Sequence, residues 1–193
     1  GQQGEGKKPS ALCHRAMLRY FRRMGEPKSI LNGQCHCGAV SFRATLTDGF
    51  NTVRRCTCSL CRMRGAVAVS ADLGGVEILE GADNLASYRF NTGEAQHFFC
   101  KTCGIYTHHQ RRSNPNQYGV NVACLEGVSP FDFAEVPVLD GVNHPNDNRG
   151  AAKRLGILRF DTSGNEEIHD ISRHPLWQRG DGQGSPEGHP ESS

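Results

Sequence analysis

The chain has few aromatic residues, little net charge and no long apolar segment. Its 193 residues include one Trp and three Met, aromatic residues make up 7%, and the formal net charge is +2. A net charge this small does not favour a nucleic-acid or membrane surface as a partner. No stretch approaches the roughly 18 apolar residues that a membrane-spanning helix needs. We therefore expect a soluble protein with no membrane partner and without nucleic acid as its main partner.

Helical patterns are also scarce. Apolar residues make up 36% of the chain and 23 residues are glycine, which suits short strands and turns better than a helical bundle. Residues 40–46 (VSFRATL) alternate between apolar and polar side chains, as a half-buried strand does. The sequence predicts an all-β fold of small antiparallel sheets, with short helical turns after Cys58 and Ser129. Further strands are predicted at 66–70, 76–80, 87–91, 96–99, 105–109 and 118–123, and a poor helix or mobile loop at 145–154.

The two ends of the chain differ from this middle part. Residues 12–24 carry four arginines and no acid, which is typical of a basic amphipathic helix on a membrane surface or in a targeting peptide. The segment from Met24, MGEPKSILNGQCHCG, looks like a natural protein start, so we favour residues 1–23 as an upstream extension with no role in function. From Arg173 onward Gly, Pro, Ser and charged residues predominate, which is typical of disorder. We expect a flexible extension at 1–28, a folded domain at 29–165 and a disordered tail at 166–193.

Cysteine is the residue with the most informative spacing. Seven of the nine cysteines fall in three clusters, CHC at 35–37, CTCSLC at 56–61 and CKTC at 100–103. A closed structural zinc site has four protein ligands, whereas a catalytic site keeps three and leaves one position open. The two pairs together supply four sulfurs and the triplet supplies three. The sequence therefore predicts two Zn²⁺ ions with different roles, one held by Cys35, Cys37, Cys100 and Cys103 and one by Cys56, Cys58 and Cys61.

The alternative for so many cysteines is a disulfide framework. Cysteines in a C-x-C pair point to opposite sides of an extended backbone, so such a pair does not readily form a disulfide of its own. A chain of 193 residues is also long enough to build a core without disulfides. We therefore favour metal sites, and with them a reducing, cytoplasmic location.

A glycine follows the last cysteine of each pair, Gly38 in CHCG and Gly104 in CKTCG. Glycine permits the positive φ of a turn that folds back on a metal and directs backbone N–H groups at the sulfurs. Two such turns from distant parts of the chain can complete one tetrahedron. The zinc of this site would then contribute directly to the folding energy.

The triplet is flanked by arginines. Positive neighbours lower the pKa of thiols and attract anions, so an open metal position here suits an anionic thiol or carboxylate substrate. The alternative is a second structural zinc whose fourth ligand comes from His97, His108 or Asp140. The flanking residues are Arg54, Arg55, Arg62 and Arg64.

The order of these motifs, followed by TxHQRRSNPNQYGVNVACLEG from Thr107, resembles the glutathione-dependent formaldehyde-activating enzyme and centromere protein V family over roughly residues 30–145. The resemblance implies a β-tent fold with two zinc sites. It assigns the two cysteine pairs to the structural zinc and the triplet to the catalytic zinc.

The resemblance also implies an activity. The namesake of the family is a carbon–sulfur lyase that joins formaldehyde to glutathione as S-(hydroxymethyl)glutathione. Zinc in an open site suits this reaction, because it lowers the pKa of a thiol or polarises an aldehyde oxygen. The competing interpretations are a non-catalytic zinc-binding interaction module, since the family includes chromatin-associated proteins, and an enzyme with another substrate on the same scaffold.

Side chains that would serve this reaction are less clearly marked. His108, with Tyr106 beside it, is our candidate for general acid/base catalysis, the alternative being a structural histidine. Arginines bind carboxylates through paired hydrogen bonds, and glutathione has two carboxylates. Residues 140–145 (DGVNHP) are either a turn or a wall of the pocket. The candidate substrate-binding residues are Arg62, Arg64, Arg111 and Arg112.

Overall fold

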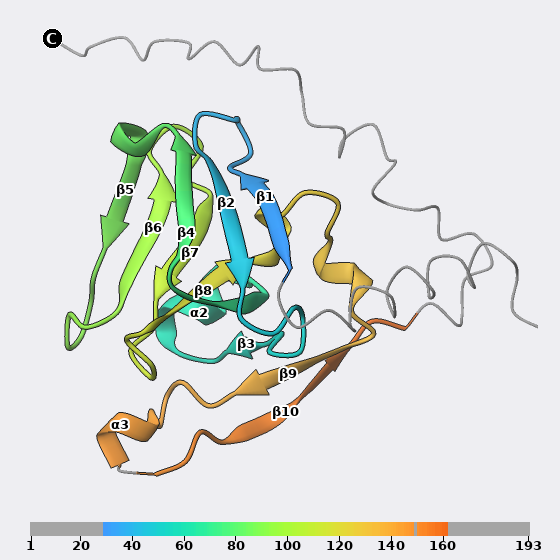
Figure 1. The fold of residues 1–193 in the computed structure, drawn as a ribbon. Coiled ribbons are helices and arrows are strands. Elements are labelled where there is room, and N and C mark those ends of the chain that lie inside the picture. The colour runs from blue at the N-terminus through green and yellow to red at the C-terminus, as the bar shows by residue number, and fades with distance from the viewer. Residues whose placement is uncertain (1–28, 149, 162–193) are drawn as a thin grey trace, which may run out of the picture.

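The computed structural model describes residues 29–148 and 150–161, which form a seven-stranded and a three-stranded sheet (Figure 1). The expected all-β fold class is confirmed. The predicted extension at 1–28 and the predicted tail at 166–193 lie outside the described residues. Within the described part of the chain, no helix has the length and apolar character needed to cross a bilayer.

The large sheet is antiparallel throughout and has the strand order β1-β2-β4-β8-β7-β6-β5. Every strand predicted from the sequence lies in this sheet, with bounds that differ by a few residues. The strands are β1 (Ile30–Gln34), β2 (Ser41–Leu46), β4 (Ala68–Glu80), β5 (Leu85–Tyr88), β6 (Gln96–Cys100), β7 (Tyr106–Gln110) and β8 (Gln117–Asn121).

The sequence predicts separate strands at 66–70 and 76–80 with a break at Gly74–Gly75, which is wrong, because β4 runs through these glycines as one strand. Gly74 has a φ of 86°, and the register between β2 and β4 shifts at this place. The two glycines thus form an irregularity that bends the strand without ending it. Strand β4 pairs with β8 over residues 68–72, and it pairs with β2 over residues 76–80 and at Ala71, on the two sides of the bend.

The small sheet, of order β10-β9-β3, was not predicted. Strand β3 (Arg55–Cys56) pairs in parallel with β9 (Glu135–Leu139), and β10 (Arg154–Arg159) pairs antiparallel with β9. The predicted helical turns are present as α2 (Ser59–Arg64) and the 3₁₀ turn η3 (Pro130–Asp132), and α3 (Pro145–Asn148) stands where a poor helix or loop was expected. Two further 3₁₀ turns are η1 (Ala82–Asn84) and η2 (Val122–Cys124).

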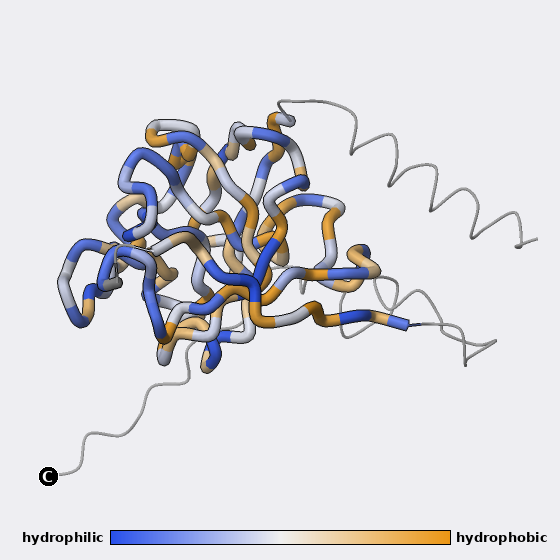
Figure 2. Tube along the Cα trace, turned by 90° about the horizontal axis from the view of Figure 1, so that it is seen from below, coloured by the Kyte–Doolittle hydropathy of each residue, from blue (hydrophilic) through white to orange (hydrophobic). Residues whose placement is uncertain are grey.

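The main core lies on one face of the large sheet. The alternating residues of β2, among them Phe42 and Leu46, are fully buried there against β4 and β8, and Phe50 packs on Phe133 with ring centroids 5.6 Å apart. Apolar segments gather in the interior while most outer loops are hydrophilic (Figure 2). Burying a large apolar side chain of this kind contributes about 1.5–3 kcal/mol. A second, smaller core contains Cys35, Val40 and Cys100.

This topology places the cysteine clusters at two different ends of the molecule. The β1–β2 turn and the β6–β7 turn lie at the end of the large sheet that is uppermost in Figure 1. The triplet lies at the other end, where β3 and α2 meet the connection between β9 and β10.

Candidate functional site

The first cluster brings together four sulfurs from two distant turns. Cys35 and Cys37 come from the β1–β2 turn, and Cys100 and Cys103 from the β6–β7 turn. Their ligand atoms all lie within 4.8 Å of one another. The Sγ atoms of Cys35 and Cys37 are 3.6 Å apart, and those of Cys37 and Cys100 are 3.7 Å apart. In a tetrahedral site with Zn–S bonds of 2.3 Å the sulfurs are about 3.8 Å apart, so these four fit Zn²⁺.

Backbone geometry supports the same site. Gly38 and Gly104 have φ angles of 78° and 71°, as expected for turns that fold back on a metal. The N–H of Val40 donates to Cys35 Sγ at 3.3 Å, and Asn84 Nδ2 donates to Cys100 Sγ at 3.5 Å. Burial raises the pKa of the Cys35 thiol to about 12, so a cation is needed to hold this sulfur as a thiolate.

The second cluster is held by α2 and by the strand before it. Cys56 ends β3, Cys58 is the N-cap of α2, and Cys61 lies in its first turn. The Cys61 N–H donates to Cys58 Sγ and the Cys58 N–H donates to Cys56 Sγ, both at 3.4 Å. The three sulfurs lie within 4.8 Å of one another. The short helix therefore forms around the cluster and aims all three sulfurs at one point.

Hydrogen bonds among these thiols shift their pKa values in opposite directions. The neighbouring thiols of Cys56 and Cys61 lower the pKa of Cys58, and the same contacts raise the pKa of Cys61. The three thiols thus titrate as one coupled group. Binding of a metal ion requires that the cluster release its protons.

Among the described residues, no fourth His, Cys, Asp or Glu ligand joins the triplet. The carboxylate of Asp140 accepts hydrogen bonds from the N–H groups of Val142 and Asn143 and from the Asn143 side chain, all at 3.0 Å. His97 Nδ1 contacts Arg64 Nη1 at 3.1 Å, and His108 does not line the cavity beside the triplet. The three sulfurs fit the open type of zinc site.

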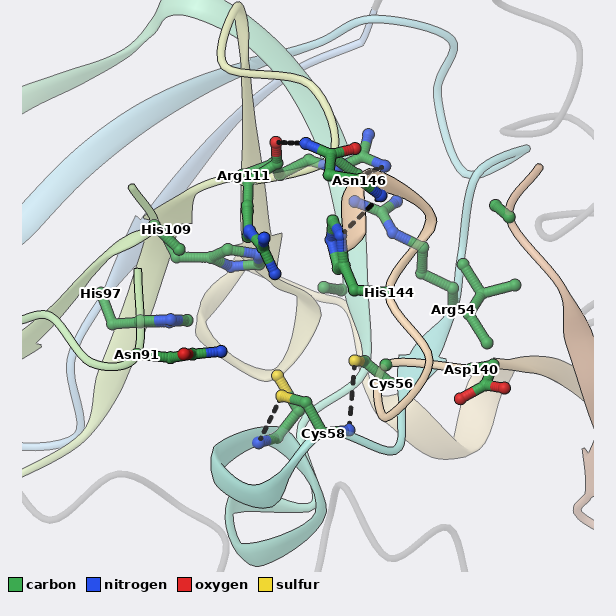
Figure 3. A pocket seen from close by; sticks show the side chains of 18 of the residues that line it. Arg54, Cys56, Cys58, Asn91, His97, His109, Arg111, Asp140, His144 and Asn146 are labelled. Atoms are coloured by element: carbon green, nitrogen blue, oxygen red, sulfur yellow. Dashed lines mark hydrogen bonds between the residues drawn. The ribbon is translucent and has the colours of Figure 1, made fainter. Parts of the chain in front are cut away.

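A cavity of about 480 Å³ opens beside the triplet. Figure 3 shows Cys56 and Cys58 at its base above α2, with His97 and His109 on the β6 and β7 side and Arg111 opposite the sulfurs. The segment at 140–145, expected as a turn or as a wall of the pocket, lines it with Asp140, Gly141, His144 and Pro145.

Gly141 sets how closely this wall approaches the triplet. A Cβ atom at this position would lie 2.3 Å from Cys56 Sγ and 2.8 Å from the backbone nitrogen of Cys58. The N–H of Gly141 also donates to Thr57 Oγ1 at 3.0 Å, which fixes the loop against the cysteine segment. The glycine therefore leaves room for the sulfur in its ligand position.

A Gly141→Ala substitution is expected to weaken metal binding at the triplet by about tenfold to a hundredfold, because the added methyl group displaces Cys56 Sγ. Metal titration in competition with a chelator measures the effect. Gly156→Ala is the matched control, since a Cβ there meets no atom of the described residues within 4 Å. Equal affinity in the two variants would contradict the steric argument.

Cross-strand register decides which histidines face the pocket. Across β6, β7 and β8, His97 pairs with His109 and His109 pairs with Gly119, so the three lie in one row on one face. The rings of His97 and His109 are stacked, with centroids 5.0 Å apart. A Cβ at Gly119 would lie 2.3 Å from His109 Cε1, so this glycine makes room for the imidazole.

The neighbouring row of the sheet faces the apolar core and contains His108. This ring stacks on Phe98 at 4.5 Å, accepts or donates a hydrogen bond with Thr107 Oγ1, and is only 4% exposed. Burial lowers its pKa to about 4. The structure therefore places our candidate acid/base, His108, outside the residues that line the pocket.

Tyr106 lines the pocket. In a regular strand it would lie on the same face as His108, two residues later, and so face away from the pocket. The register of β6 and β7 shifts between Phe98 and Phe99, which lets Tyr106 share the pocket face with His109. Its hydroxyl bonds His109 Nδ1 and donates to the Gly119 carbonyl at 3.1 Å. Burial raises the pKa of the phenol, so it stays protonated.

The four candidate arginines have four different environments. Arg62 is exposed on α2 and does not line the cavity. Arg112 pairs with Glu94 at 3.1 Å and with Asp147, so its charge is already compensated. Arg64 lies over the Tyr106 ring, 4.2 Å from its centroid.

Arg111, the fourth candidate, lines the cavity together with Arg54. Arg54 Nη1 and Arg111 Nη1 donate to the same Ser70 Oγ, at 3.0 and 3.3 Å. Neither makes an ion pair with an acid among the described residues, and Arg54 Nη2 is buried without a hydrogen-bond partner there. Burial and the charge of Arg111 lower the pKa of Arg54 to about 10. Two uncompensated guanidinium groups in one wall are suited to bind an anion.

Comparison with known proteins identifies the family of this chain. The model of the family described as "Glutathione-dependent formaldehyde-activating enzyme" matches residues 30–135. A Halomonas elongata protein named "Putative glutathione-dependent formaldehyde-activating enzyme" is 31% identical over 83 aligned residues, and the match covers 38% of this chain and 52% of that relative. The chain thus spans about half the length of this curated relative. A crystal structure of a Rhodobacter sphaeroides protein is 58% identical and covers 56% of this chain and 99% of that chain, with a TM-score of 0.55. Because the family model matches more than half of its residues, this chain belongs to the glutathione-dependent formaldehyde-activating enzyme family.

Proposed function

We propose that this protein is a zinc-dependent carbon–sulfur lyase that joins a thiol, glutathione, to a small aldehyde, formaldehyde. One observation carries the proposal most: a three-sulfur cluster without a fourth ligand among the described residues opens onto an arginine-lined cavity. The cavity of about 480 Å³ is within the range that holds ligands of this size. Family membership supports the identity of both substrates.

Arg54 and Arg111 would bind a carboxylate of glutathione. Their shared contact with Ser70 holds the two guanidinium groups side by side, and Ser70 itself is 1% exposed. A charge-assisted hydrogen bond in such a site contributes about 1.5–3 kcal/mol. With one carboxylate held there, the thiol end of the substrate is free to reach the cysteine triplet at the base of the cavity.

The triplet Cys56, Cys58 and Cys61 would hold the catalytic Zn²⁺. When bound, Zn²⁺ supplies Lewis-acid chemistry that lowers the pKa of a thiol or polarises an aldehyde oxygen. In the reaction, the sulfur of glutathione forms a bond to the formaldehyde carbon, the C=O electron pair moves to oxygen, and the thiol proton ends on that oxygen. The pocket residues orient the two reactants and exclude water, which makes the addition nearly intramolecular.

Exchange spectroscopy by NMR tests the proposal directly. Glutathione and isotopically labelled formaldehyde interconvert with S-(hydroxymethyl)glutathione, and the wild-type protein loaded with two zinc equivalents is expected to raise this exchange rate above the uncatalysed rate. An exchange rate equal to that of the protein-free sample would contradict the lyase proposal and favour a non-catalytic zinc-binding module.

An Arg111→Met substitution is expected to raise the KM for glutathione by about tenfold to a hundredfold, because it removes one charged carboxylate contact. Metal content should not change, since Arg111 contacts no cysteine of the triplet. Arg112→Met is the matched control, because its guanidinium is already paired with Glu94 and Asp147. The same rise in KM for both variants would count against a specific carboxylate site at Arg111.

A further inference from the structure

His97 has an unusual position among the pocket residues. It lies in β6, is 3% exposed, and its Nε2 atom is buried with no hydrogen-bond partner among the described residues. Figure 3 shows its ring pointing into the pocket above Cys58. Leaving a buried N–H group unpaired costs about 1–3 kcal/mol, so buried donors without a hydrogen-bond acceptor are rare in folded proteins.

The contact with Arg64 determines where the His97 proton is. Arg64 Nη1 lies 3.1 Å from His97 Nδ1. A guanidinium group has donors only, so Nδ1 must accept this hydrogen bond and cannot carry a proton. In a neutral imidazole the other nitrogen, Nε2, then carries the proton. Burial and the charge of Arg64 lower the pKa of His97 to about 4, which keeps the ring neutral.

The surroundings hold this arrangement in place. Arg64 is fixed over the Tyr106 ring. The His97 ring stacks on His109 with centroids 5.0 Å apart, and the Phe90 ring lies tilted against it with centroids 5.7 Å apart. His109 and Phe90 therefore hold the imidazole ring, and Arg64 occupies its Nδ1 edge. Nε2–H is the group that remains to meet a ligand.

This tautomer also answers the question of the fourth zinc ligand. A metal ligand must present an unprotonated nitrogen. As long as Arg64 donates to Nδ1, neither nitrogen of His97 has a free lone pair. His97 is therefore a hydrogen-bond donor in this pocket and not a candidate ligand of the triplet.

We propose that His97 Nε2–H donates a hydrogen bond to the oxygen of the substrate, the aldehyde oxygen that becomes the hydroxyl of the thiol adduct. The inference rests on the proposed function and adds to it the residue that recognises this oxygen. The negative charge on the oxygen grows as the S–C bond forms, so a donor fixed in advance binds the transition state more strongly than the aldehyde. Arg64 and Tyr106 are positioning residues that act through His97.

The tautomer is measured on the full-length, zinc-loaded protein with ¹⁵N-labelled histidine. Long-range ¹H–¹⁵N correlation is expected to show His97 protonated at Nε2 alone, with the signal assigned by its absence in His97→Gln. Addition of glutathione with formaldehyde should shift the Nε2–H resonance. S-ethylglutathione, which has the shape of the adduct but no oxygen on the added group, should leave it unshifted. An Nδ1–H tautomer, or equal shifts with both ligands, would overturn the inference.

Kinetics separate this inference from the proposed function. His97→Phe keeps the ring stacking but has no donor, and we expect its kcat for exchange to fall by about a hundredfold to a thousandfold with little change in KM. His97→Gln places an N–H near the same point and should recover at least about tenfold of that loss. If the wild-type protein catalyses exchange and a folded His97→Phe variant has the same kcat, the inference about His97 is refuted and the proposed function is not. A wild-type protein without exchange activity would refute the proposed function, whatever the tautomer.

Discussion

A Cys103→Ser variant is expected to lose the first metal ion and to be unfolded at temperatures at which the wild-type domain is folded. The four-sulfur site joins the β1–β2 turn to the β6–β7 turn, and the Cys37 and Cys100 sulfurs that meet there are 63 residues apart in sequence. A hydroxyl group is a poor zinc ligand, so the variant would leave three sulfurs around a site built for four.

The size of the effect follows from the free energies involved. Structural zinc contributes an apparent binding free energy of about 10–16 kcal/mol in small domains. The whole stability of a typical domain is about 5–15 kcal/mol. Since the second, smaller core consists largely of these cysteines, with Val40 and Leu85, little apolar burial would remain at this end of the sheet to compensate.

Thermal unfolding followed by circular dichroism, together with metal analysis, measures this outcome. Thr102→Ala is the matched control, because Thr102 is an exposed residue of the same turn whose side chain bonds only Asn84. We expect it to cost about 1 kcal/mol or less. A Cys103→Ser protein with two metal equivalents and a wild-type melting temperature would contradict a structural role for the first site.

A Cys58→Ser variant is expected to lose one metal equivalent and its exchange activity while it remains folded. Cys58 is both a ligand of the triplet and the N-cap of α2, where its sulfur accepts the Cys61 N–H. Serine is a good N-cap, so its hydroxyl can accept the same N–H and preserve the helix. The substitution therefore removes the ligand and spares the local fold.

Metal analysis, thermal unfolding and NMR exchange on the same sample distinguish the two roles. We expect one metal equivalent, a loss of stability below about 2 kcal/mol, and an exchange rate equal to the uncatalysed one. Ser59→Ala, at the adjacent exposed position of α2, is the control and should keep both metals and activity. Undiminished exchange by Cys58→Ser would exclude the triplet as the reaction centre.

Local sequence patterns predicted much of the large sheet. The alternation at 40–46 corresponds to β2, and the clusters of Gly, Asn and Asp mark most of the true turns. Gly38 and Gly104 both have the positive φ that the metal-binding turns require. These features depend on a few neighbouring residues, and for this reason the sequence alone is sufficient to predict them.

The small sheet could not be predicted from local sequence patterns, because its strands form through contacts between distant parts of the chain. Strand β3 has two residues and is a strand only because β9, about 80 positions later, pairs with it in parallel. Strand β10 (RLGILR) is mostly exposed on both faces and shows no clear alternation. Similarly, Gly74–Gly75 reads as a break, and only the partners on both sides of β4 turn it into a bend.

The pocket shows the same division. Alternation predicts that His108 and His109 face opposite ways, but it does not say which face carries the pocket. Cross-strand pairing with His97 and Gly119 places His109 on the pocket face. The irregularity between β6 and β7 brings Tyr106 to the same face. The signal that the sequence did offer was Gly119 and Gly141, whose missing side chains make room for His109 and Cys56.

The sequence by itself determined the number and kind of candidate metal ligands, because sulfur count and spacing are local properties: two pairs offer four sulfurs and one triplet offers three. Only the tertiary structure decided which arginines lack an acidic partner among the described residues and which histidines line the cavity. Arg112 is compensated by Glu94 and Asp147, while Arg54 and Arg111 are not, and the His97 tautomer depends on Arg64. Charge and protonation depend on what lies within a few ångströms in space, and folding alone brings those groups together.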